Sequence, residues 1–250
     1  MEMEQSIWFF ILVGFLAQSI DGALGMAYGV SSMSMLLSIG VPPAAASASV
    51  HASKVFTNLA SGISHWSFGN VDWVLVRKLA LPGMIGGIIG AFLLTTIPEH
   101  IIRPFISVYL IAMAVIIFRK VFSKQKNQEV RTHLFPLGLV GGFFDALGGG
   151  GWGPIVTSTL LARGNHPRFT IGSVNTAEFF VAILQSLTFI LTIGLVHWQI
   201  IIGLIIGGVI SAPMAAFLVR KIPSQSLMNI IGFVIALLGL RMIYMSLFIR

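Results

Sequence analysis

The chain has 250 residues, of which 56% are hydrophobic and 9% charged, and its mean hydropathy is +0.94. Soluble domains carry about 25% charged residues, so this composition excludes the soluble and disordered classes and predicts an all-α integral membrane protein. The net charge of +7 does not indicate a nucleic-acid partner, because the lysines and arginines lie at the ends of apolar runs. Cysteine is absent, which excludes disulfides and thiolate metal sites.

The first half of the chain opens with an apolar segment, residues 6–40, that is interrupted near its middle at Asp21 to Gly25. Three apolar runs long enough to span a membrane follow, at about 44–68, 74–96 and 100–120. Glu2 and Glu4 make the beginning of the chain acidic, whereas a cleavable signal peptide begins with a basic stretch. We therefore expect the opening segment to be retained.

A polar stretch, residues 119–133, separates the two halves of the chain. Its cationic residues are Arg119, Lys120, Lys124, Lys126 and Arg131. Basic loops of membrane proteins lie on the cytoplasmic side. The sequence therefore predicts a membrane repeat at 1–118, a basic cytoplasmic linker at 119–133 and a second membrane repeat at 134–250.

The second half of the chain repeats the first. Residues 134–164 are again apolar and interrupted, here by Asp145 and the four glycines from Gly148 to Gly151, and further spans follow at about 168–193, 199–220 and 225–248. The matched pairs, at a shift of 124 residues and then 125, include Asp21 with Asp145, Tyr28 with Trp152, Gly40 with Gly164, Gly69 with Gly194 and Trp73 with Trp198. Aspartate and tryptophan matches in one register, together with proline matches such as Pro43 with Pro167, indicate an internal duplication.

Each interrupted segment is either one broken helix that crosses the membrane or two half-helices that form a re-entrant hairpin. The hairpin places the remaining basic clusters on the same side as the linker, namely Arg77 with Lys78, Arg163 with Arg168, and Arg220 with Lys221. A hairpin followed by three spans crosses the membrane an odd number of times. We therefore expect two inverted repeats, with both termini outside, and kinked spans are the alternative.

The two glycine-rich interruptions are candidates for an anion site. Irregular backbone within a membrane survives only where protein or water covers it, and the helix that starts after each break presents free N–H groups and a positive dipole end. The candidate substrate-binding residues at the breaks are Gly25, Met26, Ala27, Gly149, Gly150, Gly151 and Trp152. The alternative is that these glycines only permit close helix packing.

Asp21 and Asp145 stand at the tips of the two hairpins. As structural groups they would cap the half-helix that follows, which aspartate does well. As functional groups they would bind a coupling proton or sodium ion. Capping is the favoured hypothesis, because two ionised carboxylates beside an anion site would repel the substrate.

Polar side chains also mark the first full span of each half. His51, Lys54 and Asn58 share one helix face, and the corresponding span carries Asn175, Thr176, Glu178 and Gln185. Lys54 and Glu178 are equivalent in the repeat, so a two-fold axis could bring them together. Either His51, Lys54, Asn175 and Thr176 help to hold the anion while Glu178 carries a coupling proton, or Lys54 and Glu178 form a buried salt bridge that fixes helix register.

The chain resembles the TauE/SafE family of sulfite and organosulfonate exporters from Ile7 to Leu247. The stretches that carry the resemblance are Ile20 to Gly25 and Phe144 to Pro154, together with the duplication and the basic loop. The resemblance implies a multi-pass protein of the bacterial inner membrane that transports sulfur-containing anions such as sulfite, sulfoacetate or thiosulfate.

The function expected from the residues and the resemblance is secondary transport of small anions by alternating access. Its partners would be the lipid bilayer, the anion and a proton or sodium ion, with no metal or cofactor and with the oligomeric state left open. The alternative is a cation- or proton-coupled carrier of another small metabolite that uses Asp21, Asp145 and Glu178. An enzyme is not expected, because no Ser-His-Asp or His-Glu spacing lies within the spans.

Overall fold

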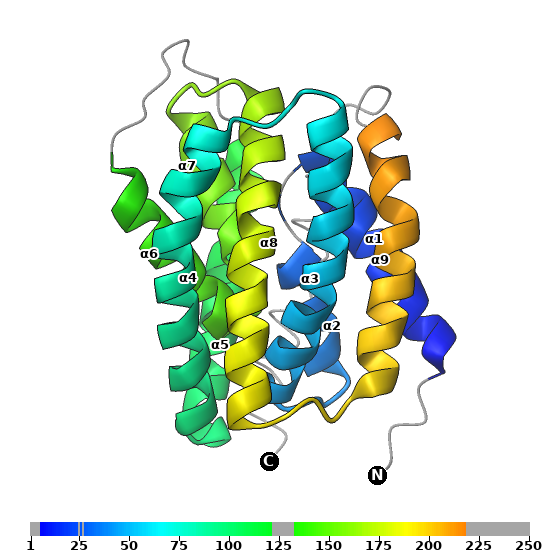
Figure 1. The fold of residues 1–250 in the computed structure, drawn as a ribbon. Helices are drawn as coiled ribbons and strands as arrows, with labels where there is room; N and C mark the ends of the chain where they lie inside the picture. Colours follow the sequence, from blue (N-terminus) through cyan, green and yellow to red (C-terminus); the bar gives the residue numbers. More distant parts are fainter. Residues whose placement is uncertain (1–5, 25, 27, 122–132, 219–250) are drawn as a thin grey trace.

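The computed structural model describes residues 6–24, 26, 28–121 and 133–218 (Figure 1). In chain order the elements are α1 (Ile7–Leu24), α2 (Tyr28–Ser38), α3 (Pro43–Ser67), α4 (Trp73–Thr96), α5 (Glu99–Val121), α6 (Leu134–Gly148), the π-helical turn η1 (Gly153–Thr157), α7 (Ser158–Ala162), α8 (Pro167–Thr192) and α9 (Trp198–Leu218). These described residues contain no strand, so the all-α prediction is confirmed for them. The predicted span at 225–248 and most of the basic linker lie outside them.

Both predicted interruptions are present in the structure. α1 ends at Leu24 before α2 begins at Tyr28, and α6 ends at Gly148 before η1 begins at Gly153. The second break differs from the expected single half-helix, because a π-helical turn comes first and the short helix α7 follows. The N–H of Ser158 donates to the carbonyl of Gly153, five residues earlier, which is the wide π-type bond often found at functional sites.

The turns between the helices repeat the register found in the sequence. Gly40 and Gly164 have φ angles of 93° and 90°, and Gly69 and Gly194 have φ angles of 66° and 73°. These left-handed conformations strain any residue with a Cβ, so the matched glycines are required at these helix ends. The two halves of the chain therefore turn at equivalent residues with equivalent backbone conformations.

Helices of each half pack mainly against helices of the other half, an arrangement that we call exchanged packing. α3 and α8 lie side by side at the centre of the bundle and run in opposite directions (Figure 1). α1 packs mainly against α9, and α6 packs mainly against α4. In the repeat, α1 corresponds to α6 and α4 to α9. The opening helix of each half therefore contacts the same helix of the other half, α9 in one case and α4 in the other.

Small residues allow these close contacts. Gly86 and Gly90 of α4 lie directly against the backbone of Leu139 and Phe143 in α6, and Gly207 of α9 lies against the backbone of Ile11 in α1. Glycine has no side chain to hold the helices apart, which is how helices associate closely in membranes. These contacts place the ends of α1 and α6 deep in the bundle.

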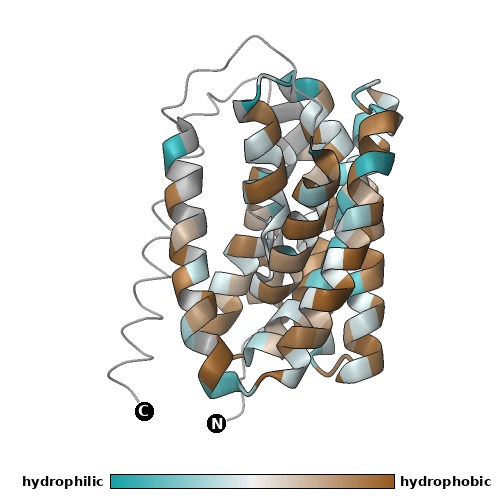
Figure 2. Cartoon of the chain, turned by 90° about the vertical axis from the view of Figure 1, so that its left-hand side faces the viewer, coloured by the Kyte–Doolittle hydropathy of each residue, from teal (hydrophilic) through white to brown (hydrophobic). Residues whose placement is uncertain are grey.

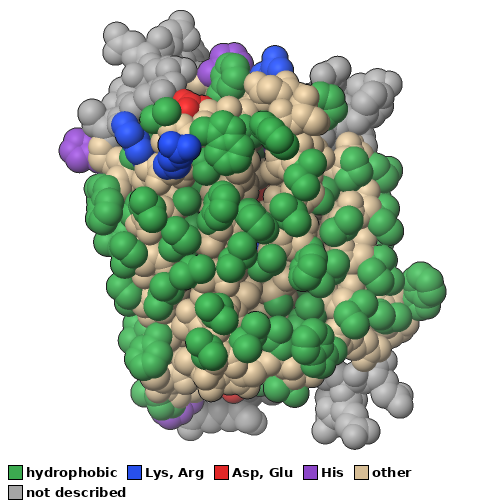
Figure 3. Space-filling model, viewed as in Figure 1, with side chains coloured by type: hydrophobic (Ala, Val, Ile, Leu, Met, Phe, Trp, Pro, Cys, Tyr) green, Lys and Arg blue, Asp and Glu red, His purple; other side chains and the backbone are tan. Residues whose placement is uncertain are grey.

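The outside of the bundle is apolar along its length. Figure 2 shows hydrophobic residues along the whole length of the helices, and in Figure 3 hydrophobic side chains cover the middle of the face in view. By length and composition, two described helices could each cross a membrane, Trp73–Thr96 and Arg168–Thr192. The lysine and arginine side chains in view gather at the upper end in Figure 3.

Candidate functional site

The two breaks touch each other inside the bundle. A Cβ on Gly29 would overlap the backbone of Gly149 and Gly150, and a Cβ on Gly150 would overlap the backbone of Gly29 and Val30. Only glycine permits so close an approach of two backbones. The start of α2, directly after the first break, therefore lies against the second break. Of the candidates at the first break, Met26 is buried, and Gly25 and Ala27 lie outside the described residues.

Both aspartates at the breaks accept hydrogen bonds from the backbone that follows. Asp145 Oδ1 accepts from the N–H groups of Gly151 at 2.9 Å and Trp152 at 3.2 Å. Asp21 Oδ1 accepts from the N–H of Tyr28 at 3.2 Å. Tyr28 and Trp152 are equivalent in the repeat, so the two carboxylates cap equivalent residues. The N–H of Gly151, predicted to contact an anion, therefore contacts an internal carboxylate in this structure.

The Asp145 carboxylate also accepts hydrogen bonds from side chains of α3 and α8. Lys54 Nζ lies 2.8 Å from Asp145 Oδ1 and 2.7 Å from Glu178 Oε1, so one ammonium group is shared by two carboxylates. Gln185 Nε2 donates to Asp145 Oδ2 at 3.2 Å, and His51 Nε2 lies 3.1 Å from the same oxygen. All five side chains are buried. We name this group of His51, Lys54, Asp145, Glu178 and Gln185 the central cluster.

The ring of His51 lies between its own helix and the Asp145 carboxylate. Its Nδ1 lies 2.8 Å from the backbone oxygen of Ser47 and 3.2 Å from Ser47 Oγ. Its Nε2 faces the carboxylate of Asp145, which also accepts from Lys54 and from two backbone N–H groups. His51 thus places an imidazole ring beside Lys54 at the same carboxylate.

The remaining predicted site residues lie around the central cluster, and their side chains donate hydrogen bonds to other groups of the protein. Trp152 Nε1 donates to the backbone oxygen of Val174 at 3.1 Å, and its side chain is fully buried. Asn175 Nδ2 donates to Ser61 Oγ at 3.1 Å. Thr176 Oγ1 donates to the carbonyl of Gly172, four residues earlier in the same helix, at 2.7 Å. Asn175 Oδ1 is buried and has no hydrogen-bond partner among the described residues.

Sequence reasoning missed two contributions to the cluster. Gln185 was placed on the polar face of its helix, but its hydrogen bond to Asp145 was not foreseen. Ser47 was not considered, although it lies four residues before His51 and therefore on the same helix face. Its Oγ donates to the carbonyl of Ala146 at 2.6 Å, which ties α3 to the end of α6. Serine one helical turn from a buried histidine is the signal that could have indicated it.

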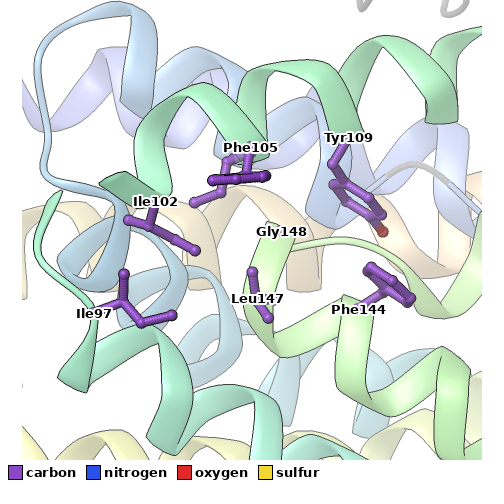
Figure 4. Close-up of a pocket in the computed structure, with 8 residues that line it drawn as sticks. Ile97, Ile102, Phe105, Tyr109, Phe144, Leu147 and Gly148 are labelled. Atoms are coloured by element: carbon purple, nitrogen blue, oxygen red, sulfur yellow. The ribbon is translucent and has the colours of Figure 1, made fainter. Parts of the chain in front are cut away.

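A separate pocket lies beside the second break, between α5 and α6 (Figure 4). Its volume is about 330 Å³, and its lining residues are Ile97, Ile102, Phe105, Ile106, Tyr109, Phe144, Leu147 and Gly148. The ring of Tyr109 stacks on Phe144 with 5.5 Å between centroids, and its side chain covers Gly148. The lining is apolar and carries no charge, so this pocket is unsuited to holding a small anion.

Comparison with known proteins agrees with the membrane architecture. The sequence model of the family described as "Sulfite exporter TauE/SafE" matches residues 10–242. The chain is 42% identical over 242 residues to "Probable membrane transporter protein YtnM" of Bacillus subtilis (strain 168), across 93% of this chain and 81% of that protein. It is 22% identical over 249 residues to "Probable membrane transporter protein YjnA" of the same organism, across 93% of this chain and 98% of that protein. No solved structure matches the chain.

The family match and the more similar relative each extend over most of the chain. They agree with the apolar helical bundle and with a location in the bacterial cell membrane. They also make the protein a transporter rather than an enzyme. The chain belongs to the TauE/SafE sulfite exporter family of membrane transporters.

Proposed function

We propose that the chain is a secondary transporter of small anions whose substrates are sulfur-containing oxyanions or organosulfonates such as sulfite or sulfoacetate. The family description supports the sulfur chemistry. The observation that carries the proposal is the set of polar groups collected around Asp145: an ammonium group, an imidazole, an amide and two backbone N–H groups. Such a set is what a buried oxyanion needs, because an anion without charged or polar partners is very costly to bury.

In this proposal Asp145 occupies the donors in the absence of substrate. A sulfite or sulfonate group presents three oxygens and would bind Lys54, His51 and the N–H groups of the second break in place of the carboxylate. Trp152, Asn175 and Thr176 would be neighbours of the bound anion, and the first break would contribute Gly25, Met26 and Ala27. Exchange between an internal carboxylate and a substrate anion lets the site open without leaving a buried cation unpaired.

Alternating access follows from the arrangement of the two halves. We infer that residues 1–118 and 134–250 are inverted repeats, with the linker at 119–133 in the cytoplasm and both termini outside. The exchanged packing of α1 with α9 and of α6 with α4, and the opposite directions of α3 and α8, support this inference. Rocking of one half against the other would expose the touching breaks to each side in turn.

Transport by purified protein in liposomes tests the proposed function. We expect liposomes that contain the protein to accumulate labelled sulfite, and unlabelled sulfoacetate or methanesulfonate to compete with it. Lys54→Met should weaken anion binding by about 100-fold, because a hydrogen bond to a charged group contributes up to about 3 kcal/mol. Lys78→Met is the matched control, since Lys78 is an exposed cation near the start of α4.

Two results would contradict the proposal. One is wild-type liposomes that take up sulfite and sulfonates no faster than empty liposomes. The other is a Lys54→Met protein, monodisperse in detergent, that binds sulfite as tightly as the Lys78→Met control. Either result would contradict the binding of a sulfite or sulfonate anion at the central cluster.

A further inference from the structure

Among the described residues, carboxylates outnumber lysine and arginine side chains in the buried centre of the bundle. Asp21, Asp145 and Glu178 are each at most 4% exposed, and Lys54 is the buried cation that contacts two of them. An ionised carboxylate without a counter-charge is costly in a low-dielectric interior, and such a group favours binding of a proton.

Asp145 is not the surplus group. It accepts hydrogen bonds from two backbone N–H groups, from Lys54 and from Gln185, and it faces His51, which is the environment of an ionised carboxylate. Asp21 differs sharply from it. Its Oδ1 accepts from the N–H of Tyr28, and its Oδ2 is buried with no hydrogen-bond partner among the described residues.

The duplication explains why the two aspartates differ. Asp145 is paired with Lys54, and a shift of 124 residues relates Asp145 to Asp21 and Lys54 to Glu178. The same shift makes Glu178 the counterpart, for Asp21, of the lysine that pairs with Asp145. Where the repeat has a carboxylate and an ammonium group at one pair of positions, it has two carboxylates at the equivalent pair.

The structure assigns a proton-binding role to Asp21 and Glu178, and we propose that the proton they share is the coupling ion for anion transport. Two carboxylates in one buried site share a proton because both cannot ionise together. This inference rests on the proposed function.

The coupling follows from the position of Lys54. When the shared proton lies on Glu178, the ammonium group of Lys54 loses one carboxylate partner and can bind the substrate anion. When the proton leaves, Glu178 pairs with Lys54 again at the 2.7 Å distance of the present structure, and the anion is released. The other titratable groups near this pair are Tyr28 and Asp145, and α1 and α9 add no titratable side chain besides Asp21 among their described residues. Anion and proton therefore bind together, and acidification strengthens anion binding.

Infrared spectroscopy of the purified protein tests the proton site without transport. A protonated carboxylic acid has a C=O stretching band that an ionised carboxylate lacks. We expect a band that titrates with pH in the wild type and disappears in both Asp21→Asn and Glu178→Gln. Glu99→Gln, at the exposed start of α5, is the matched control and should keep the band. A titrating band that survives in both variants would overturn the shared proton.

Liposomes with a trapped pH-sensitive dye test the coupling. Methanesulfonate is the probe, because its sulfonate group carries no proton of its own near neutral pH. We expect methanesulfonate entry to acidify the interior of the liposomes. We also compare the rate of methanesulfonate uptake driven by a pH gradient with the rate at which labelled and unlabelled methanesulfonate exchange across the membrane. The ratio of the first rate to the second should fall about tenfold in Asp21→Asn, equivalent to about 1.4 kcal/mol of lost coupling. Uptake driven by sodium and indifferent to pH would overturn the coupling proton. Absence of any sulfite or sulfonate flux in the wild type would instead contradict the proposed function, and the infrared band would still decide the proton site.

Discussion

At the scale of single residues, Lys54 is the group on which the central cluster depends. The sequence left a Lys54–Glu178 salt bridge as one of two alternatives, and the structure has that contact at 2.7 Å. It also adds Asp145 at 2.8 Å, so the pair is part of a larger group. Asp145 keeps four other polar partners if Lys54 is lost, whereas Lys54 is the donor that the structure gives to Glu178. The two carboxylates should therefore respond differently to removal of the lysine.

Double substitutions test this difference. Lys54→Met should lower the free energy of unfolding by about 3–5 kcal/mol, because it leaves buried carboxylates without their counter-charge. Adding Glu178→Gln should restore most of the loss, while adding Asp145→Asn should restore little, since it removes the cap of the second break and leaves Glu178 unpaired. Thermal unfolding in detergent measures all three, with Lys78→Met as control. Equal recovery in the two double variants would show that the carboxylates are equivalent.

At the scale of elements, the breaks serve both packing and the site. Their glycines bring two backbones into contact, as the packing hypothesis required, and the carboxylate that caps the second break contacts Lys54 and His51. The two hypotheses for the glycines are therefore compatible. A side chain at Gly150 would meet the backbone of the first break, which cannot move aside as a flexible side chain can.

A pair of glycine substitutions compares the backbone contact at Gly150 with the packing around an ordinary helix glycine. Gly150→Ala should destabilise the protein by about 1–3 kcal/mol, the usual cost of overpacking. Gly62→Ala is the matched control, since its Cβ would lie 3.4 Å from Thr176 Oγ1, an ordinary contact, and alanine gains up to about 1 kcal/mol of helix propensity. Unfolding midpoints in detergent measure both. If Gly150→Ala were as stable as Gly62→Ala, the close approach of the breaks would be wrong.

At the scale of the whole molecule, charge distinguishes the two ends of the bundle. The helix ends that carry Arg77, Lys78, Arg119 and Arg168 lie at the upper end in Figure 1, where the chain also enters and leaves the linker. Basic ends of membrane proteins face the cytoplasm. We therefore expect the upper end in Figure 1 to be cytoplasmic.

Cysteine labelling tests this orientation. Because the chain has no native cysteine, only the introduced cysteine can react with the label. Ser67 is exposed at the upper end of α3, and Thr96 is exposed at the opposite end, where α4 finishes. In cells, Thr96→Cys should react with an impermeant maleimide added outside, and Ser67→Cys should react only after the membrane is opened. Reaction of Ser67→Cys in intact cells would reverse the orientation, and reaction of both would show that α3 and α4 do not connect the two sides as expected.

The sequence by itself determined the helical class, the approximate positions of both breaks, the register that matches Gly40 with Gly164 and Gly69 with Gly194, and the helix face that carries Lys54. These features are local, because hydrophobic run length, backbone conformations open to glycine and helical spacing each depend on residues that are close together in the sequence. The equivalence of Asp21 with Asp145 was likewise visible as a repeat.

Only the tertiary structure decided that the equivalent aspartates have unequal partners. Asp145 receives Lys54, His51 and Gln185 from α3 and α8, while Asp21 keeps an unpartnered oxygen among the described residues. It also decided that the N–H groups of the second break are occupied by Asp145. The physical reason is that hydrogen bonds and ion pairs between distant segments depend on how helices pack across the bundle. Residue spacing fixes which face a side chain occupies, but the packing of the two halves fixes which charge it meets.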